Sequence, residues 1–165
     1  MNGQKRSIDK MISEITQLKN RVDELGRLEV NEILDHKQTL KALQQSEDKF
    51  YKAFHCCPHI ITISSLSDGR YIAVNEAFSS VTNYEQNEVV GRTVEELGIW
   101  EVPQERELIL NEIELKGSIR NHEMRFRTKT NQLITTLISA DQIDIAGDKQ
   151  LLFVVKDISD RKKME

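Results

Sequence analysis

The residues with the strongest capacity for chemistry lie together in the stretch FHCCPH, Phe54 to His59, which holds both cysteines of the chain. Thiolates and imidazoles bind zinc, so the stretch could be a metal site. Zinc ligands usually stand two to four residues apart, whereas Cys56 and Cys57 are adjacent and point apart in an extended chain. The spacing therefore favours a packed, metal-free loop that enters the first strand.

Haem is disfavoured at the same stretch. Covalent c-type attachment needs Cys-x-x-Cys-His, and the sequence here reads Cys-Cys-Pro-His. The dipeptide Cys57-Pro58 could present a thiolate to haem iron. We favour a packed loop that leads into the first strand.

Composition limits the classes of function. The chain has 165 residues and a net charge of −4, which argues against a nucleic-acid binder. It has no apolar run near the ~20 residues that span a bilayer, and its first residues lack the apolar core of a signal peptide. We expect a cytoplasmic protein without membrane insertion. Nucleotide-hydrolase, zinc-protease and serine-hydrolase motifs are missing, so we expect no enzyme.

The first part of the chain has a helical rhythm. We expect a helix over residues 7–54, and we divide the chain into a helical segment at 1–49 and a domain at 50–165. Apolar residues follow gaps of three and four, as in a heptad seam: Ile8, Met11, Ile15, Leu18, Val22 and Leu25. The pattern fits a parallel coiled coil in a homodimer, or a helix packed on its own domain. Gly26 is either a stutter in one helix or the end of a first one.

From residue 60 the apolar period changes to two. IITIS at 60–64 and YIAVN at 71–75 flank Asp68-Gly69, a strong hairpin signal. Short helical pieces follow, and then a longer helix at 103–117 between a proline and a glycine. Three strands close the chain, at 121–129, 132–144 and 151–158. Helices between two groups of strands predict an α+β fold with an antiparallel sheet.

The last two predicted strands carry apolar side chains on both faces. In a sheet with one solvent-exposed face, apolar and polar residues would alternate more regularly along each strand. We therefore expect the second face to be covered, either by the N-terminal helix or by another chain.

Several stretches together resemble a PAS domain of the kind common in bacterial sensor histidine kinases and diguanylate cyclases. The resemblance covers residues 46–165 and rests on SEDKFYKAF, DGRYIAVNEAFSSVTNYEQNEVVGRT, LGIWEVPQERELIL, EMRFRTKTNQ and the closing VVKDISDRKKME. It implies a five-stranded antiparallel sheet flanked by short helices, preceded here by a long signalling helix. It also implies a regulatory sensor or relay role, and a histidine kinase or diguanylate cyclase as output domain in the same or a partner chain. The alternative is a ligand-free dimerisation and interaction module.

The cofactors of the family can be tested on this sequence. Light-sensing flavin members carry a cysteine just after the Gly-Arg pair, and Gly91-Arg92 is followed here by Thr93. Haem-sensing members use a histidine on the long helix, and residues 103–116 contain none. The resemblance therefore disfavours haem and covalent flavin, and no cofactor is predicted.

A pocket between helices and sheet would suit a small apolar ligand. The lone tryptophan, Trp100, either lines such a pocket or belongs to a plain core. We predict the lining from residues expected to face inward, although a slip of one residue exchanges the faces of a strand. They are Ile63, Val74, Phe78, Leu97, Trp100, Leu108, Phe126 and Ile138.

The closing stretch KDISDRKKME is the candidate for signal transfer, through Asp157, Ile158, Ser159 and Arg161. Ser159 is predicted to cap a new helix. Asp157 and Arg161 stand four residues apart and could form a pair. That pair would be either a surface ion pair of ~0–1 kcal/mol or a latch that reports the state of the sheet to the next helix.

Overall fold

A computed structural model describes residues 1–165, which divide into two compact units, residues 1–49 and residues 50–165. The first helix, α1 (Asn2–His55), is longer than predicted and continues through Gly26. Gly26 does not have the positive φ of a glycine that ends a helix. The structure therefore decides the question at Gly26 in favour of one unbroken helix. Val22 and Ile33 lie eleven residues apart on it, the spacing of a stutter in a heptad pattern.

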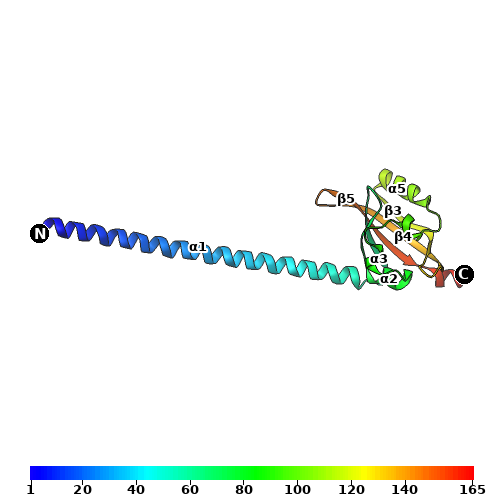
Figure 1. Ribbon diagram of the computed structural model, residues 1–165, viewed down its shortest axis with the longest axis horizontal. Helices are drawn as coiled ribbons and strands as arrows, with labels where there is room; N and C mark the ends of the chain where they lie inside the picture. The colour runs from blue at the N-terminus through cyan, green and yellow to red at the C-terminus, as the bar shows by residue number, and fades with distance from the viewer. The chain divides into compact units, whose positions relative to one another are not determined.

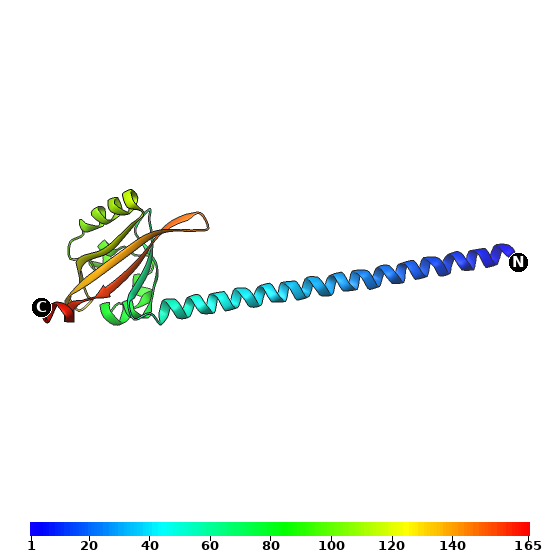
Figure 2. The same cartoon turned by 180° about the vertical axis from the view of Figure 1, so that it is seen from behind.

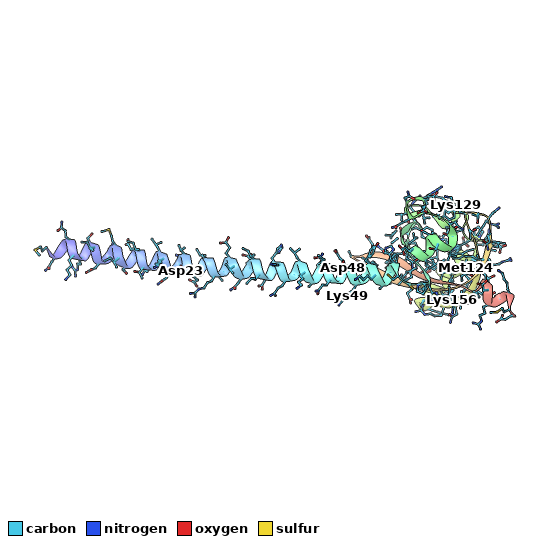
Figure 3. All side chains as sticks on the ribbon, turned by 90° about the horizontal axis from the view of Figure 1, so that it is seen from below. Asp23, Asp48, Lys49, Met124, Lys129 and Lys156 are labelled. Carbon is cyan, nitrogen blue, oxygen red and sulfur yellow. The ribbon has the colours of Figure 1, made fainter.

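Side chains stand out from α1 along residues 1–49, Asp23 among them (Figure 3). The predicted seam is exposed at every position, from 52 % at Ile8 to 66 % at Val22. A solitary helix in water does not need a continuous apolar stripe of this kind. None of the helices is long and apolar enough to span a membrane.

The second unit is built on one sheet (Figures 1 and 2). Its strands are β1 (Ile60–Ser65), β2 (Tyr71–Val74), β3 (Ser118–Arg127), β4 (Leu133–Ile145) and β5 (Asp148–Asp157), and its helices are α2 (Glu76–Thr82), α3 (Gln86–Val89), α4 (Val94–Leu97), α5 (Glu105–Lys116) and α6 (Ser159–Lys163). The strand order is β2-β1-β5-β4-β3, and every pair is antiparallel. The predicted α+β fold with a five-stranded antiparallel sheet is confirmed.

Glycines and short loops set the ends of these elements. Gly69 has φ +71° in the turn between β1 and β2, and Gly117 has φ +78° at the end of α5. Both conformations favour glycine, because in other residues the Cβ atom clashes with the backbone at a positive φ. Pro103 lies before α5, which begins at Glu105, and not inside its first turn as predicted. β3 begins directly after Gly117, three residues earlier than predicted, and bulges at Asn121.

Helices α2 to α5 cover one face of the sheet, and their buried residues join the inward side chains of the strands in a single core. Figure 1 shows α5 lying over this face. In the register of the sheet, Phe153 of β5 lies between its two partners, Thr62 of β1 and Ala140 of β4. These three residues therefore share the inner face. Ile63 and Leu152 face each other on the outer face. Strands β4 and β5 continue as a hairpin past the other strands (Figure 2).

Candidate functional site

A cavity of about 30 Å³ lies between the inner face of the sheet and helices α4 and α5. It is large enough for one or two water molecules. Strands β1, β2, β3 and β5 contribute to its wall, as do the loop before α5 and α5 itself. The cavity therefore gathers residues that lie far apart in the sequence.

Three hydroxyl groups border the cavity from strands β1 and β2. Thr62, Ser64 and Tyr71 are only 4 %, 6 % and 5 % exposed, and Ser64 and Tyr71 are direct register partners. None of the three hydroxyls has a hydrogen-bond partner in the protein, although every fully enclosed side-chain polar atom has one. The three oxygens thus face the free space of the cavity. Because no fully enclosed polar side-chain atom lacks a partner, these three oxygens stay accessible to a molecule in the cavity.

Tyr71 remains a hydrogen-bond donor throughout the physiological range. Burial raises the pKa of its phenol far above the usual value, and the nearby charge of Glu95 raises that pKa further. Its ring packs edge-on against Phe78, with 5.7 Å between the ring centroids. The hydroxyl is therefore held in place as well as protonated.

Arg106 of α5 brings a positive charge to the same side of the cavity. Its guanidinium lies against Gly69, where an added Cβ would stand only 2.5 Å from Nη2. Its Nε lies 3.5 Å from Oε1 of Glu95 on α4, and its side chain is 25 % exposed. A side chain at position 69 would displace the guanidinium from this place, so the glycine of the turn permits the position of Arg106.

An aromatic wall closes the cavity on the side of β3 and β5. The Trp100 ring stacks on Phe126 at 6.4 Å between centroids and meets Phe153 edge-on at 6.3 Å. Trp100 and Phe126 are also bridge partners through their backbones, and Glu101 donates its N–H to the carbonyl of Arg125. The loop that carries Trp100 is thus attached to β3.

The predicted pocket residues are brought together only in part. Trp100 and Phe126 line the cavity, so Trp100 is at once a core residue and a wall of the cavity. Val74, Phe78 and Ile138 are fully buried in the same core but do not reach the cavity. Leu97 is half-buried and packs against that core.

Two of the predicted pocket residues are misplaced. Ile63 is buried on the opposite face of the sheet, because Thr62 and Ser64 take the inward positions of β1. Leu108 is 63 % exposed, since α5 turns Ile109 and Ile113 inward. Each error is a shift of one residue. Sequence reasoning also missed Arg106 and the hydroxyl wall, although two hydroxyl residues two positions apart in the apolar stretch IITISS were a signal for it.

Asn75 connects the end of α1 to the sheet, and sequence reasoning missed this role. Its side chain is 1 % exposed and donates to the carbonyls of Phe54 (3.0 Å) and His59 (2.9 Å). Its Oδ1 accepts from the N–H groups of Ile61 and Phe78 and so caps α2. The asparagine in VNEAF, directly before a helical stretch, was the available signal.

The junction after β5 differs from its prediction. Oδ1 of Asp157 accepts from the N–H and the hydroxyl of Ser159 at 2.8 and 2.6 Å, while Arg161 pairs with Glu165. The pair that Asp157 and Arg161 could form by their spacing is not present, and Asp157 is instead engaged at the start of α6. Ser159 is the first residue of α6 and not its cap, a position that Ile158 occupies.

Ser159 and Ile158 also bind the neighbouring strand β4. The N–H of Thr135 donates to the Ser159 hydroxyl at 3.0 Å, and the N–H of Ile158 donates to the Thr135 carbonyl at 2.9 Å. Lys162 of α6 pairs with Glu123 of β3 at 3.0 Å. The start of α6 is thus coupled to three strands of the sheet.

The FHCCPH stretch ends α1 and leads into β1. His55 is the last residue of α1 and lies against the ring of Tyr51, Cys56 is exposed and Cys57 is half-buried. No group of three or more His, Cys, Asp or Glu side chains is arranged to hold a metal ion. That the stretch is metal-free stays a prediction.

Comparison with known proteins assigns the fold to a family. The model of the PAS domain family matches residues 58–160. The chain belongs to the PAS domain family. Within this PAS domain, the cavity, Asn75 and Asp157 all lie inside the matched residues.

The PAS domain and its long helix are similar to parts of signalling proteins. A methyl sulfide methyltransferase-associated sensor from Methanosarcina acetivorans is 28 % identical over 155 residues, which cover 89 % of this chain but 15 % of that protein. A domain of a sensory box sensor histidine kinase/response regulator from Geobacter sulfurreducens has a TM-score of 0.56 at 19 % identity, with 70 % of this chain and 96 % of that one covered. The PAS domain, in complex with ethanol, of a LuxR-family transcriptional regulator from Burkholderia thailandensis has a TM-score of 0.56 at 17 % identity, with 66 % and 96 % covered. The two structures share the fold.

Proposed function

We propose that this PAS domain is a regulatory sensor or relay module of a cytoplasmic signal-transduction protein, which binds a small ligand and passes signals through its flanking helices. The observation that carries the proposal is the cavity beside Trp100, with three buried hydroxyls that lack partners in the protein. These hydroxyls are not sealed in the core, since every fully enclosed side-chain polar atom has a partner, and they are therefore free to bind a molecule in the cavity. A ligand would supply the missing partners.

The strands that would contact the ligand also reach both helices. Thr62 borders the cavity and follows Ile61, whose N–H donates to Asn75 beside the end of α1. Val155 of β5 borders the cavity and lies two residues before Asp157, which holds the start of α6. A shift of β1 or β5 around a ligand would therefore act on α1 and α6 through short, hydrogen-bonded connections.

The proposed partners, a second copy of the chain and an output domain, are inferred from helices α1 and α6. The exposed stripe on α1 supports a parallel homodimer. The contacts of α6 with β3 and β4 support an output domain such as a histidine kinase or diguanylate cyclase, in the same or a partner chain. The structural neighbour from a sensor histidine kinase is consistent with such an output. The chain spans 15 % of the length of the Methanosarcina sensor, so the output is proposed on these grounds alone.

We also propose that the domain is not an enzyme and carries neither haem nor covalent flavin. The position after Arg92 is a threonine that caps α4, and α5 offers no histidine. The arrangement of side chains around the cavity supplies donors for binding and no nucleophile paired with a base.

The alternative function is a ligand-free dimerisation and interaction module. Its support is the small volume of the cavity together with the long exposed stripe of α1. The two functions differ in whether a small molecule occupies the cavity.

Native mass spectrometry of the protein purified from cells separates the two. We expect wild type to carry a small molecule that is released on denaturation. Ser64→Leu fills the cavity from β1 and should abolish the extra mass, while Ser67→Leu in the exposed hairpin turn should keep it. If wild type carries no extra mass, the interaction module is favoured. Haem, or a flavin that stays attached to the chain after denaturation, would contradict the cofactor proposal.

Asp157→Ala should change signal output more than stability. It removes the acceptor of two hydrogen bonds at the start of α6, in an exposed position, and should lower the free energy of unfolding by only about 1 kcal/mol. In a longer protein that joins the domain to its output enzyme, we expect the basal activity of that enzyme to change. Asp160→Ala, at an almost fully exposed carboxylate one turn away, is the matched control. Equal output from wild type and Asp157→Ala would show that this junction does not transmit the signal.

A further inference from the structure

We infer that the ligand of this cavity is a small monocarboxylate, held by the guanidinium of Arg106 and by the hydroxyls of Thr62, Ser64 and Tyr71. The inference rests on the proposed function and names its ligand class. It follows from the polar groups in the wall, the sign of their charge and the size of the space.

The lining of the cavity offers donors and one positive charge, whose nearest carboxylate, Glu95, lies outside the lining. No carboxylate or amide side chain lines the cavity, and Arg106 is its only charged residue. Glu95 meets Arg106 at Nε alone, at 3.5 Å, and the two terminal nitrogens of the guanidinium have no hydrogen-bond partner in the protein. A guanidinium stays charged at every relevant pH, and its planar fork matches the two oxygens of a carboxylate.

The three hydroxyls complete the site for an oxygen acceptor. Each is more than nine-tenths buried, borders the cavity and has no partner in the protein. The phenol of Tyr71 stays protonated because burial raises its pKa. A carboxylate has about four lone-pair positions and can accept from the guanidinium and from hydroxyls at once. A cation would be repelled by Arg106, and a neutral alcohol or amide would leave the two terminal nitrogens of the guanidinium without an anionic acceptor.

The polar and apolar walls are ordered across the sheet. The hydroxyls come from β1 and β2, and Arg106 lies over Gly69 in the turn that joins these strands. Phe153 on β5 and Phe126 on β3 form the opposite, apolar side with Trp100. A carboxylate bound at the first side would direct an aliphatic group toward the second. The volume of about 30 Å³ is room for one or two water molecules, so the wall must open around a bound carboxylate and favours the shortest aliphatic groups.

The lone tryptophan makes the test direct. Trp100 borders the cavity, so its fluorescence reports occupancy in the intact chain. We expect sodium propionate, titrated at constant ionic strength, to give a saturable change in the millimolar range, and propionamide of the same shape to bind at least about 10-fold more weakly. Arg106→Gln should weaken propionate binding at least about 10-fold. Arg92→Gln, at an exposed arginine that pairs with Glu96 outside the cavity, should leave it unchanged.

A second variant tests the carboxylate site even if Arg106→Gln does not fold. Tyr71→Phe retains the buried ring and removes one donor, and it should weaken propionate binding about 3- to 10-fold. If propionamide binds as tightly as propionate, or if both variants bind propionate like wild type, the carboxylate assignment is wrong while the sensor proposal stands. If neither compound binds, the inference is overturned. Ligand-free protein in native mass spectrometry would then remove the sensor proposal as well.

Discussion

Replacing Ile15 and Leu18 of α1 together with aspartate is expected to convert the proposed homodimer to a monomer. Both side chains are 63 % exposed in the single chain, in the middle of the stripe from Ile8 to Leu25. Burying a side chain of this kind contributes about 1.5–3 kcal/mol, and the dimer contains two copies of each. The substitution removes this contribution and places four carboxylates in an apolar seam.

The expected loss of affinity is large. A loss of about 4 kcal/mol, below the sum of these contributions, already raises the dissociation constant roughly 1,000-fold. Analytical ultracentrifugation at micromolar concentration should show wild type at twice the chain mass of 19.1 kDa and the variant near that mass. Gln17→Asp with Asn20→Asp adds the same charge on the other side of the helix and should leave the dimer intact. A variant that stays as dimeric as wild type would show that the main contact lies elsewhere, with the outer face of the sheet as the next candidate.

Replacing Asn75 with alanine is expected to lower the free energy of unfolding by about 3 kcal/mol or more. The side chain is 1 % exposed and makes hydrogen bonds of 2.9 to 3.1 Å to Phe54, His59, Ile61 and Phe78. Alanine leaves these backbone groups without their partner, and each buried, unsatisfied group costs about 1–3 kcal/mol. The loss should appear as a lower midpoint in urea unfolding at an unchanged slope.

Hydrogen exchange shows whether Asn75→Ala loosens the junction of α1 and β1 or destabilises the whole domain. Because Asn75 holds the carbonyl of Phe54 at the end of α1, hydrogen exchange at residues 54–61 should rise more than exchange at β3 and β4. Asn87→Ala removes an exposed asparagine from α3 and should change neither measurement by more than ~0.5 kcal/mol. A drop of less than 1 kcal/mol for Asn75→Ala would mean that water or the backbone replaces the side chain.

The sequence predicted the fold, because the patterns that indicate each helix, strand and turn are local. The heptad spacing of α1, the Asp68-Gly69 turn and the glycine stop at Gly117 each depend on a few neighbouring residues, and each appears in the structure. The change of period at residue 60 separated helix from sheet in the same way.

The face of each element needed the tertiary structure. Strand β1 carries apolar residues on both faces, so alternation alone could not show that Thr62 and Ser64 point inward and Ile63 outward. Helix α5 has apolar residues around much of its circumference, so its spacing could not choose between Leu108 and Ile109. The elements that pack against β1 and α5 determine which of their faces points into the core.

The contacts of the candidate site also depended on tertiary structure. Asp157 and Arg161 have the spacing of a pair, yet the turn after β5 brings Ser159 to the carboxylate first. Arg106 and Gly69 stand far apart in the sequence, and they meet only because α5 packs over the β1–β2 turn. The sequence by itself determined the elements and their order. The cavity and its donors arise where distant elements meet, because their contacts depend on packing and not on spacing along the chain.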